Sequence, residues 1–424
     1  MRNKATGEIL VKIVLCLLLS SIAGLALLVL VYLLPVKGME SHVLESIEIF
    51  YTEGVYPQVV SGYKGSQLDN ETDAIMILKA IYPGKEEGVF EKALSIPSVA
   101  ITGEFSGCRS LVAYLWEGVQ TDGVSEYGRY WHGYLVILKP LLILFNYADI
   151  RYLNMFAQFF LLAYVLVLMI ERGMKKYLIS LLTAIMIVNP VATAMSMQFS
   201  SVYYVSLLSC IFLLKKKAWL EKDDKRYYYF FFIIGIATSY FDFLTYPTAS
   251  LTMPLVLVLL MERLNLKEAV KRVIILSLFW GTGYIGMWMM KWVIYYIVLH
   301  YNIFAEISAR VQVHTGEVVV SGEELNTFEV AIKNLKVFAR SPYLMLGTAI
   351  VVYFLVKERK NIKKACKNVL YLIPFFMIAV IPIIWLMLTK NHAGWLYWYT
   401  SRGLMGMVFS LISSVIYITE YGKE

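Results

Sequence analysis

Three acidic side chains fall within five residues, at Asp69, Glu71 and Asp73. Asp69 suits the N-cap of a helix predicted over Glu71 to Ala80, because its carboxylate can accept a hydrogen bond from a free N–H of the first turn. The spacing of four residues places Asp69 and Asp73 near one face of that helix. A carboxylate here could take the proton of an acceptor hydroxyl, and two together could bind a divalent cation such as Mg²⁺ or Mn²⁺. We therefore treat both as candidate catalytic or metal-binding residues, with a solvated acidic turn as the alternative.

Seven further polar side chains lie at the ends of apolar segments or just inside them. Ionisable groups at membrane depth are costly, so each suggests a function. Arginine and lysine could bind a phosphate, and the aromatic residues beside them could bind sugar faces. The alternatives are an aromatic belt with a snorkelling arginine, a helix cap, or an interfacial anchor. The candidates for substrate and lipid-phosphate binding are Arg129, His132, Asp242, Lys291, Asn391, His392 and Arg402.

The composition indicates a membrane protein. Of the 424 residues, 59% are hydrophobic and 17% are charged, whereas soluble domains carry about 25% charged residues. The net charge of +8 does not indicate nucleic-acid binding, because Lys and Arg concentrate in short connectors, as they do on the cytoplasmic side of membrane proteins. Of the four cysteines, only Cys108 lies in the long polar stretch, which excludes a disulfide framework or a cysteine metal site within one chain.

Repeated apolar runs predict an all-α polytopic bundle of about 10–11 hydrophobic segments. These runs are 13–34, 134–148, 152–170, 177–190, 198–214, 228–241, 248–261, 273–298, 342–356, 370–389 and 404–419. Lysine and arginine concentrate in the connectors Lys215 to Arg226, Arg263 to Arg272 and Lys357 to Lys367, which predicts the inner side for all three. Both chain ends then fall inside, which requires an even number of crossings. We therefore expect either 134–148 or 177–190 to be re-entrant or short of a full crossing.

The longest polar stretch, 35–133, holds 14 Asp or Glu against 7 Lys or Arg. Such an acidic excess after a helix whose N-terminus is inside fits the extracytoplasmic side. We divide the chain into a first transmembrane helix (1–34), an extracytoplasmic loop with the acidic motif (35–133) and a transmembrane bundle (134–424). Outer loops are expected near 242–247, 300–342 and 390–402. The candidate polar residues all map to this outer side, which predicts a single polar site opening outward.

The order of these features resembles the GT-C superfamily of integral-membrane glycosyltransferases, near the GtrII-like glucosyltransferases of bacteria. The resemblance covers nearly the whole chain, although many members carry the acidic motif closer to the first helix. It rests on the N-in helix, the long loop with Leu68 to Asp73, and Tyr130-Trp131-His132-Gly133 before the next segment. It continues through Asp149 to Asn154, Asn189-Pro190, Phe241 to Pro247, Gly283-Tyr284 with Lys291-Trp292, and Asn391-His392 with Thr400 and Arg402.

The resemblance implies a multi-pass hexosyltransferase of a bacterial plasma membrane, with inverting chemistry on the extracytoplasmic face. It implies a polyprenyl-phosphate sugar as donor and a cell-envelope glycan or lipid as acceptor, among membrane lipids and without nucleic acid. Asp69, or else Asp73, would be the general base. Arg129, Lys291 and Arg402, with His392, would hold the lipid phosphate. The alternative is a lipid or polysaccharide flippase or another transporter, which would distribute polar residues along a path through the membrane.

Overall fold

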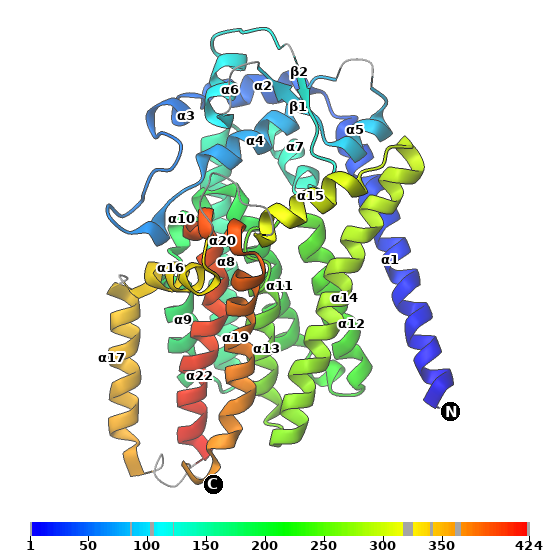
Figure 1. Ribbon diagram of the computed structural model, residues 1–424. Helices are drawn as coiled ribbons and strands as arrows, with labels where there is room; N and C mark the ends of the chain where they lie inside the picture. The colour runs from blue at the N-terminus through cyan, green and yellow to red at the C-terminus, as the bar shows by residue number, and fades with distance from the viewer. Residues whose placement is uncertain are drawn as a thin grey trace.

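The computed structural model describes residues 2–84, 87–101, 106–121, 123–316, 325–339, 342–360 and 366–421. Within these ranges the chain is almost entirely helical (Figure 1). One two-stranded antiparallel sheet joins β1 (Ser98–Ala100) to β2 (Gly123–Ser125). Parts of the predicted outer loop 300–342 and of the predicted connector 357–367 lie outside the described residues.

Six stretches of helix are long and apolar enough to cross a membrane. At about 1.5 Å per residue, each has the length that a hydrocarbon core of about 30 Å requires. A seventh span results if α16 (Thr327–Ala339) and α17 (Pro342–Lys357) are taken as one span bent by 81°. The prediction of a helical chain with several helices long and apolar enough to cross a membrane is thereby confirmed. The six stretches lie in α1 (Arg2–Tyr32), α8 (Tyr147–Glu171), α11 (Met197–Leu220), α14 (Leu266–Leu299), η3 with α19 (Cys366–Leu372, Ile373–Leu388) and α21 to α22 (Tyr397–Thr400, Met405–Tyr421).

Shorter helices complete the bundle. They are α7 (Leu135–Leu144), α9 (Leu178–Met186), α10 (Pro190–Met195), α12 (Asp224–Phe241) and α13 (Ala249–Glu262). The closest crossing joins α12 to α14 at Gly235 and Gly283, where a Cβ on either residue would lie 2.1 Å from a carbonyl oxygen of the facing helix. Small residues at such crossings let two membrane helices approach backbone to backbone.

The basic connectors gather at one end of the bundle, which we call the basic end (Figure 1). Arg263 and Lys176 both pair with Glu420, at 3.0 and 3.5 Å, and Arg272 pairs with Asp224 at 2.8 Å. These contacts involve the turn after α8, the connector between α13 and α14, the starts of α12 and α14, and the end of α22. The first and last described residues of the chain also lie at this end.

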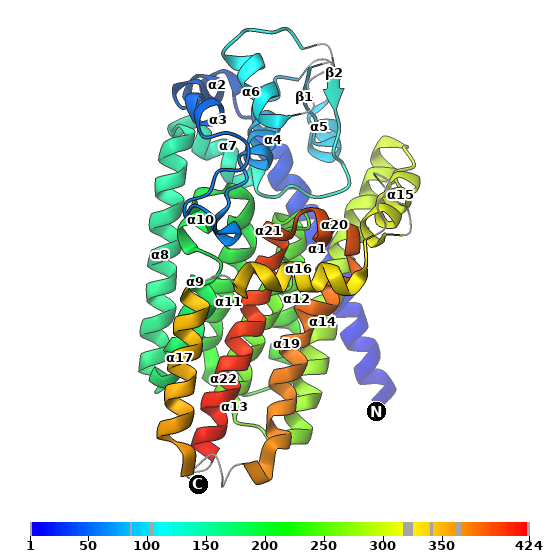
Figure 2. The same ribbon diagram turned by 60° about the vertical axis from the view of Figure 1, so that its left-hand side comes forward.

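Residues 35–133 form a cap over the opposite end, which we call the loop end (Figure 2). The cap contains α2 (Val36–Glu45), α3 (Glu48–Thr52), η1 (Lys64–Ser66), α4 (Asn70–Ala80), α5 (Val89–Ser95) and α6 (Gly107–Leu115). Its apolar side chains, such as Met39, Ile77 and Leu111, share one core with Leu28 of α1 and Leu138 of α7. This shared core fixes the cap, and with it the acidic motif, against the bundle.

The connector helices α15 (Phe304–Thr315) and α20 (Lys390–Trp395), with η4 (Ser401–Leu404), also lie at the loop end. The side chain of His392 contacts the Leu244 carbonyl at 2.8 Å, and Asn391 donates to the Val313 carbonyl at 2.7 Å. The described parts of the three predicted outer loops therefore meet one another and face the cap.

The two short segments that could account for the odd number of apolar runs behave differently. Helix α7 starts and ends at the loop end, because Gly133 donates to the Tyr240 carbonyl and His42 of α2 contacts the Leu142 carbonyl. The 177–190 segment instead runs between the two ends. Tyr177 donates to Glu420 at the basic end, and the Ile187 carbonyl accepts from Tyr63 of the cap. Helix α7 has 10 residues and α9 has 9, so each is shorter than the roughly 20 residues that a full crossing needs.

Candidate functional site

Asp73 is a buried helix-capping residue in this fold. Its Oδ2 accepts from the Tyr147 hydroxyl at 2.7 Å and from the Met197 N–H at 2.9 Å, and its Oδ1 accepts from the Gln198 N–H at 3.0 Å. Met197 and Gln198 open α11, so the carboxylate faces the positive end of that helix dipole. Burial nevertheless raises the pKa of Asp73 to about 6. Both of its oxygens are occupied, which favours a structural role for this side chain.

Glu71 has a similar role at another helix. It accepts from the N–H groups of Gly107 and Cys108 and from the Ser106 hydroxyl, all at the start of α6. Residue 107 must be glycine for this approach, since a Cβ there would lie 2.8 Å from the Glu71 carbonyl oxygen. Two of the three clustered acids therefore tie α4 to the N-termini of neighbouring helices.

Asp69 differs from both neighbours. It is the N-cap of α4, and its Oδ1 accepts from the Thr72 N–H at 2.9 Å, as the sequence predicts. Thr72 is the only described residue that donates to this carboxylate, and no other donor lies within hydrogen-bond distance of its Oδ2. Burial raises the pKa of Asp69 to about 7, with the nearby Asp73 charge adding to the effect and the hydrogen bonds from Thr72 opposing it. A carboxyl group that titrates near neutral pH and keeps one oxygen free can act as a general base.

The surroundings of Asp69 come from both the cap and the bundle. Its N–H donates to the Ser196 hydroxyl at 3.0 Å, just before α11. Its charge acts on the hydroxyls of Tyr56 in the cap and Tyr399 in α21. Tyr56 also packs edge-on against Trp398, with ring centroids 5.0 Å apart. Asp69 therefore lies where residues far apart in the sequence converge.

The predicted metal-binding pair does not fit this arrangement. A divalent cation needs carboxylate oxygens with free lone pairs directed at it. Both Asp73 oxygens instead accept from N–H or O–H donors. Among the described residues, no group of three or more His, Cys, Asp or Glu is placed to hold a metal ion. We therefore assign no catalytic metal ion to Asp69 and Asp73.

Arg402, a predicted phosphate-binding residue, is buried and holds the cap to the bundle. It donates to the carbonyls of Gly65 and Gln67, at 3.2 and 3.3 Å, and to the Val188 carbonyl. It also donates to the Thr193 hydroxyl at 2.7 Å. Its guanidinium stacks over the Phe199 ring at 4.0 Å. These partners occupy both of its terminal nitrogens, so its placement supports a positioning role rather than phosphate binding.

Lys291, a second predicted phosphate-binding residue, is likewise occupied. Its ammonium donates to the carbonyl of Leu94 at 2.7 Å and to that of Ala93 at 3.3 Å, which joins α14 to the end of α5. It also lies 5.3 Å from the centre of the Trp131 ring. The sequence shows a lysine within an apolar helix but not that backbone carbonyls of the cap would satisfy it.

Lys79 is a functional candidate that sequence reasoning missed. It is buried in the last turn of α4, where its ammonium lies 5.0 Å from the centre of the Tyr127 ring and makes no hydrogen bond within the described residues. Burial and the neighbouring Arg129 charge lower its pKa to about 7. A buried ammonium without an acceptor is costly and gains most from an anionic ligand. No sequence signal marked it, because one lysine near the end of a short helix is ordinarily solvated.

Arg129 and His132 lie beside Lys79. Arg129 pairs with Glu306 of α15 and stacks on the Tyr127 ring at 4.4 Å. The two nitrogens of His132 contact the Tyr134 hydroxyl at 3.0 Å and the Tyr127 carbonyl at 3.1 Å. Burial and the nearby lysine charges lower the pKa of His132 well below its usual value, so the ring is neutral.

Asp242 and His392 stabilise the turns at the loop end. Both Asp242 oxygens accept from the Thr245 N–H, at 3.0 and 3.2 Å, and Oδ2 also accepts from the Leu244 N–H at 3.1 Å. The Leu244 carbonyl in turn contacts His392, whose pKa is lowered to about 3, chiefly by burial. These hydrogen bonds stabilise the turn that follows α12, in which Asp242 is the C-cap residue, and do not reach the first turn of α13, which begins at Ala249.

An aromatic cluster formed by Tyr130, Tyr284 and Trp288 lies between Lys79 and Asp242. The Trp288 ring packs against Tyr130 at 5.5 Å and against Tyr284 at 5.1 Å, and Tyr130 packs against Tyr127 at 5.4 Å. The Tyr284 hydroxyl and the Trp288 Nε1 are buried and have no hydrogen-bond partner within the described residues. Aromatic faces with unpaired donors suit a hydroxylated ring such as a sugar.

An apolar groove of about 650 Å³ runs down the outside of the bundle between α7, α8 and α11. Its walls include exposed apolar side chains such as Ile137, Phe156 and Leu208. At the loop end it reaches Met197, which binds Asp73 through its N–H, and Tyr134, which contacts His132. A lipid chain in this groove would therefore have its head beside α4.

No protein-family model, curated protein or solved structure matches this chain.

The resemblance to the GT-C superfamily therefore stays a prediction, and the evidence for function comes from the residues of the site. The structure brings most of the predicted residues to one end of the molecule and divides them by role. Asp69 keeps a free oxygen, while Asp73, Lys291 and Arg402 are occupied by the fold. Lys79, the aromatic cluster and the apolar groove extend the site beyond the residues predicted from sequence.

Proposed function

We propose that this protein is a membrane glycosyltransferase that moves a sugar from a polyprenyl-phosphate donor to a cell-envelope glycan or lipid. The observation that carries the proposal is the contrast within the acidic motif. Of its three buried or half-buried carboxylates, only Asp69 combines a free oxygen with a pKa of about 7. General bases are most effective when their pKa lies near the working pH.

In this proposal Asp69 accepts the proton of the acceptor hydroxyl. The acceptor oxygen forms a bond to the anomeric carbon as the bond from that carbon to the lipid phosphate oxygen breaks. The electron pair leaves with the polyprenyl phosphate, and the configuration at the anomeric carbon inverts. This reaction step needs neither a nucleotide nor a redox partner.

Three further features support the assignment of the donor. The apolar groove can take the polyprenyl chain, and its loop end adjoins His132 and α4. Lys79 offers an ammonium without an acceptor for the phosphate, and Arg129 adds positive charge beside it. Asp69 and Lys79 are separated along α4 by about 15 Å, which their side chains with a sugar phosphate between them can span.

The distribution of charge favours transfer over transport. The buried ionisable side chains of the described bundle, such as Asp242, Lys291 and Arg402, lie towards the loop end, where Lys291 and Arg402 donate to carbonyls of the cap. Polar side chains buried deeper in the helices are uncharged: Ser206 and Thr252 bond to their own helix, and Gln158 of α8 donates to Ser200 of α11. A transporter would be expected to carry charged or strongly polar groups along its path.

The test is transfer by purified protein in liposomes, using radiolabelled polyprenyl-phosphate sugars and crude envelope acceptor. The proposal predicts a labelled product with at least one donor and a strong loss of rate in Lys79→Gln. Lys336→Gln, an exposed lysine on α16, is the matched control and should retain the wild-type rate. Movement of donor across the bilayer without product would contradict the proposal and favour the flippase.

A further inference from the structure

A second pocket lies at the loop end of α1, away from Asp69. It has a volume of about 480 Å³ and is formed where α1, α2, α5, α7 and the end of α4 meet. Three lysines line it (Lys37, Lys92 and Lys139) with one acid, Glu40, so its charged side chains sum to 3 − 1 = +2. Glu40 accepts from the Tyr114 hydroxyl at 2.8 Å. The pocket is therefore suited to an anion.

Two lysines of this pocket have no partner. Lys139 donates to the Ala80 carbonyl at 2.6 Å, but Lys37 and Lys92 form no hydrogen bond or ion pair through their side chains within the described residues. The first turn of α2 also contributes to the wall through Val36 and Lys37. No side chain caps that turn, because its N-cap is Pro35, so free N–H groups and the positive end of the helix dipole face the same region.

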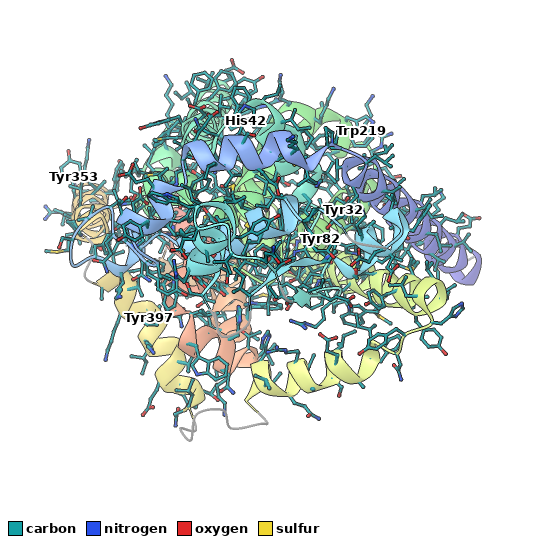
Figure 3. The ribbon with its side chains drawn as sticks, turned by 90° about the horizontal axis from the view of Figure 1, so that it is seen from above. Tyr32, His42, Tyr82, Trp219, Tyr353 and Tyr397 are labelled. Carbon is teal, nitrogen blue, oxygen red and sulfur yellow. The ribbon has the colours of Figure 1, made fainter. Side chains whose placement is uncertain are left out.

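An unpaired hydroxyl supplies an independent indication of a ligand. Tyr32 is 6% exposed and lines the pocket, yet its hydroxyl is buried and has no hydrogen-bond partner in the part of the chain that the structure describes. Seen from the loop end, Tyr32 lies next to Tyr82, which lines the same pocket (Figure 3). Leaving a buried hydroxyl unpaired is costly, and an acceptor oxygen in the pocket would remove that cost.

The position of the pocket identifies the kind of anion. Tyr32 is the last residue of the membrane span Gly7–Tyr32, so the pocket lies at the level of the membrane interface. Most of α1 is not buried by the protein and is left to lipid. Basic pockets between membrane helices bind phosphate head groups of anionic lipids on the cytoplasmic side, and the same attraction between lysines and a phosphate applies to a pocket at this interface.

We propose that this pocket binds the phosphate of an anionic lipid head group from the adjoining leaflet. The phosphate oxygens accept from Lys37, Lys92 and the Tyr32 hydroxyl, while Lys139 supplies charge from the wall. The bound lipid links α1, the cap and α7 at the point where the cap joins the bundle. This binding site does not depend on the proposed transferase activity.

The test is native mass spectrometry of the purified full chain released from micelles containing phosphatidylglycerol or phosphatidylcholine. We expect one tightly retained phosphatidylglycerol and no equivalent phosphatidylcholine. Lys37→Gln with Lys92→Gln should weaken that binding about tenfold or more, and Tyr32→Phe a few-fold. Lys222→Gln with Lys225→Gln, two exposed lysines at the basic end, removes the same charge and should leave the binding unchanged.

Equal weakening by the two double variants, or equal retention of both lipids, would overturn the proposal. Inorganic phosphate provides a separate comparison, because the same side chains could bind a soluble anion. If phosphate alone raises the melting temperature as much as phosphatidylglycerol does, and the Lys37 and Lys92 variant abolishes both effects, the lipid assignment is wrong.

Discussion

The two ends of the bundle handle charge in different ways. At the basic end, charged side chains pair with each other, as the exposed Arg263 does with Glu420 and the largely buried Arg272 does with Glu262. At the loop end, charged side chains are buried and bind mainly backbone groups, as Asp73 does at α11 and Lys291 does at α5. Exposed pairs contribute little free energy, whereas a buried charge that loses its partners is strongly destabilising. The loop end is therefore where single substitutions should affect folding or chemistry.

The largest effect is expected for Asp73→Ala. This change leaves the Tyr147 hydroxyl and the N–H groups of Met197 and Gln198 without their acceptor. We expect the free energy of unfolding to fall by about 3–5 kcal/mol, as for removal of one partner of a buried charged network. Chemical denaturation of the detergent-solubilised protein measures it. A loss below about 1 kcal/mol would mean that the capping network is not formed.

Asp69→Asn should raise the free energy of unfolding at pH 8, whereas Asp73→Ala lowers it. The folded pKa of Asp69, about 7, lies above its ordinary value of 3.8, so the folded state binds the proton more tightly than the unfolded state. This carboxyl therefore makes stability fall as pH rises from about 4 to about 7. Asparagine keeps the N-cap but cannot ionise. We expect the variant to be more stable than the wild type at pH 8, by roughly 1–3 kcal/mol, and equal to it near pH 4. A wild-type advantage at pH 8 would refute the raised pKa.

Glu71→Gln should have a smaller effect. The amide keeps one acceptor oxygen for the start of α6, but its NH2 group replaces the other and cannot accept, and the charge that favours a helix N-terminus is lost. We expect a loss of about 1 kcal/mol in the free energy of unfolding, with faster proteolysis of the cap. A loss as large as that of Asp73→Ala would show that both acids belong to one cooperative network.

The smallest effect is expected for Arg263→Gln at the basic end. The Arg263 side chain is 55% exposed, and its pair with Glu420 is open to solvent. We expect a change below about 0.5 kcal/mol that shrinks further at high salt. A change of several kcal/mol would remove the contrast between the two ends.

The sequence could predict the structural features that depend on local residue patterns. The apolar runs predicted a multi-pass helical protein, and Asp69 followed by a helical stretch predicted the N-cap of α4. These inferences depend on neighbouring residues only. The odd number of apolar runs also predicts that one short segment fails to cross, and α7 and α9 are both shorter than a full span.

Long-range contacts were beyond sequence reasoning. Asp73 meets residues 124 and 125 positions away, and Arg402 meets carbonyls of the cap more than 300 positions away. A carbonyl partner leaves no sequence signature, because every residue carries one. For the same reason the sequence suggested a phosphate partner for Lys291 and Arg402, and it gave no sign that Lys79 would be buried without an acceptor among the described residues.

The most direct test of the central claim compares Asp69→Asn with Asp73→Asn in the liposome transfer assay, at several pH values. If Asp69 is the general base, Asp69→Asn abolishes transfer while remaining folded, and wild-type transfer rises with pH through about 7 as Asp69 loses its proton. Asp73→Asn should lower stability, and the molecules that remain folded should still transfer sugar. Full transfer by folded Asp69→Asn, or loss of transfer only in folded Asp73→Asn, would contradict the assignment of Asp69 as the base.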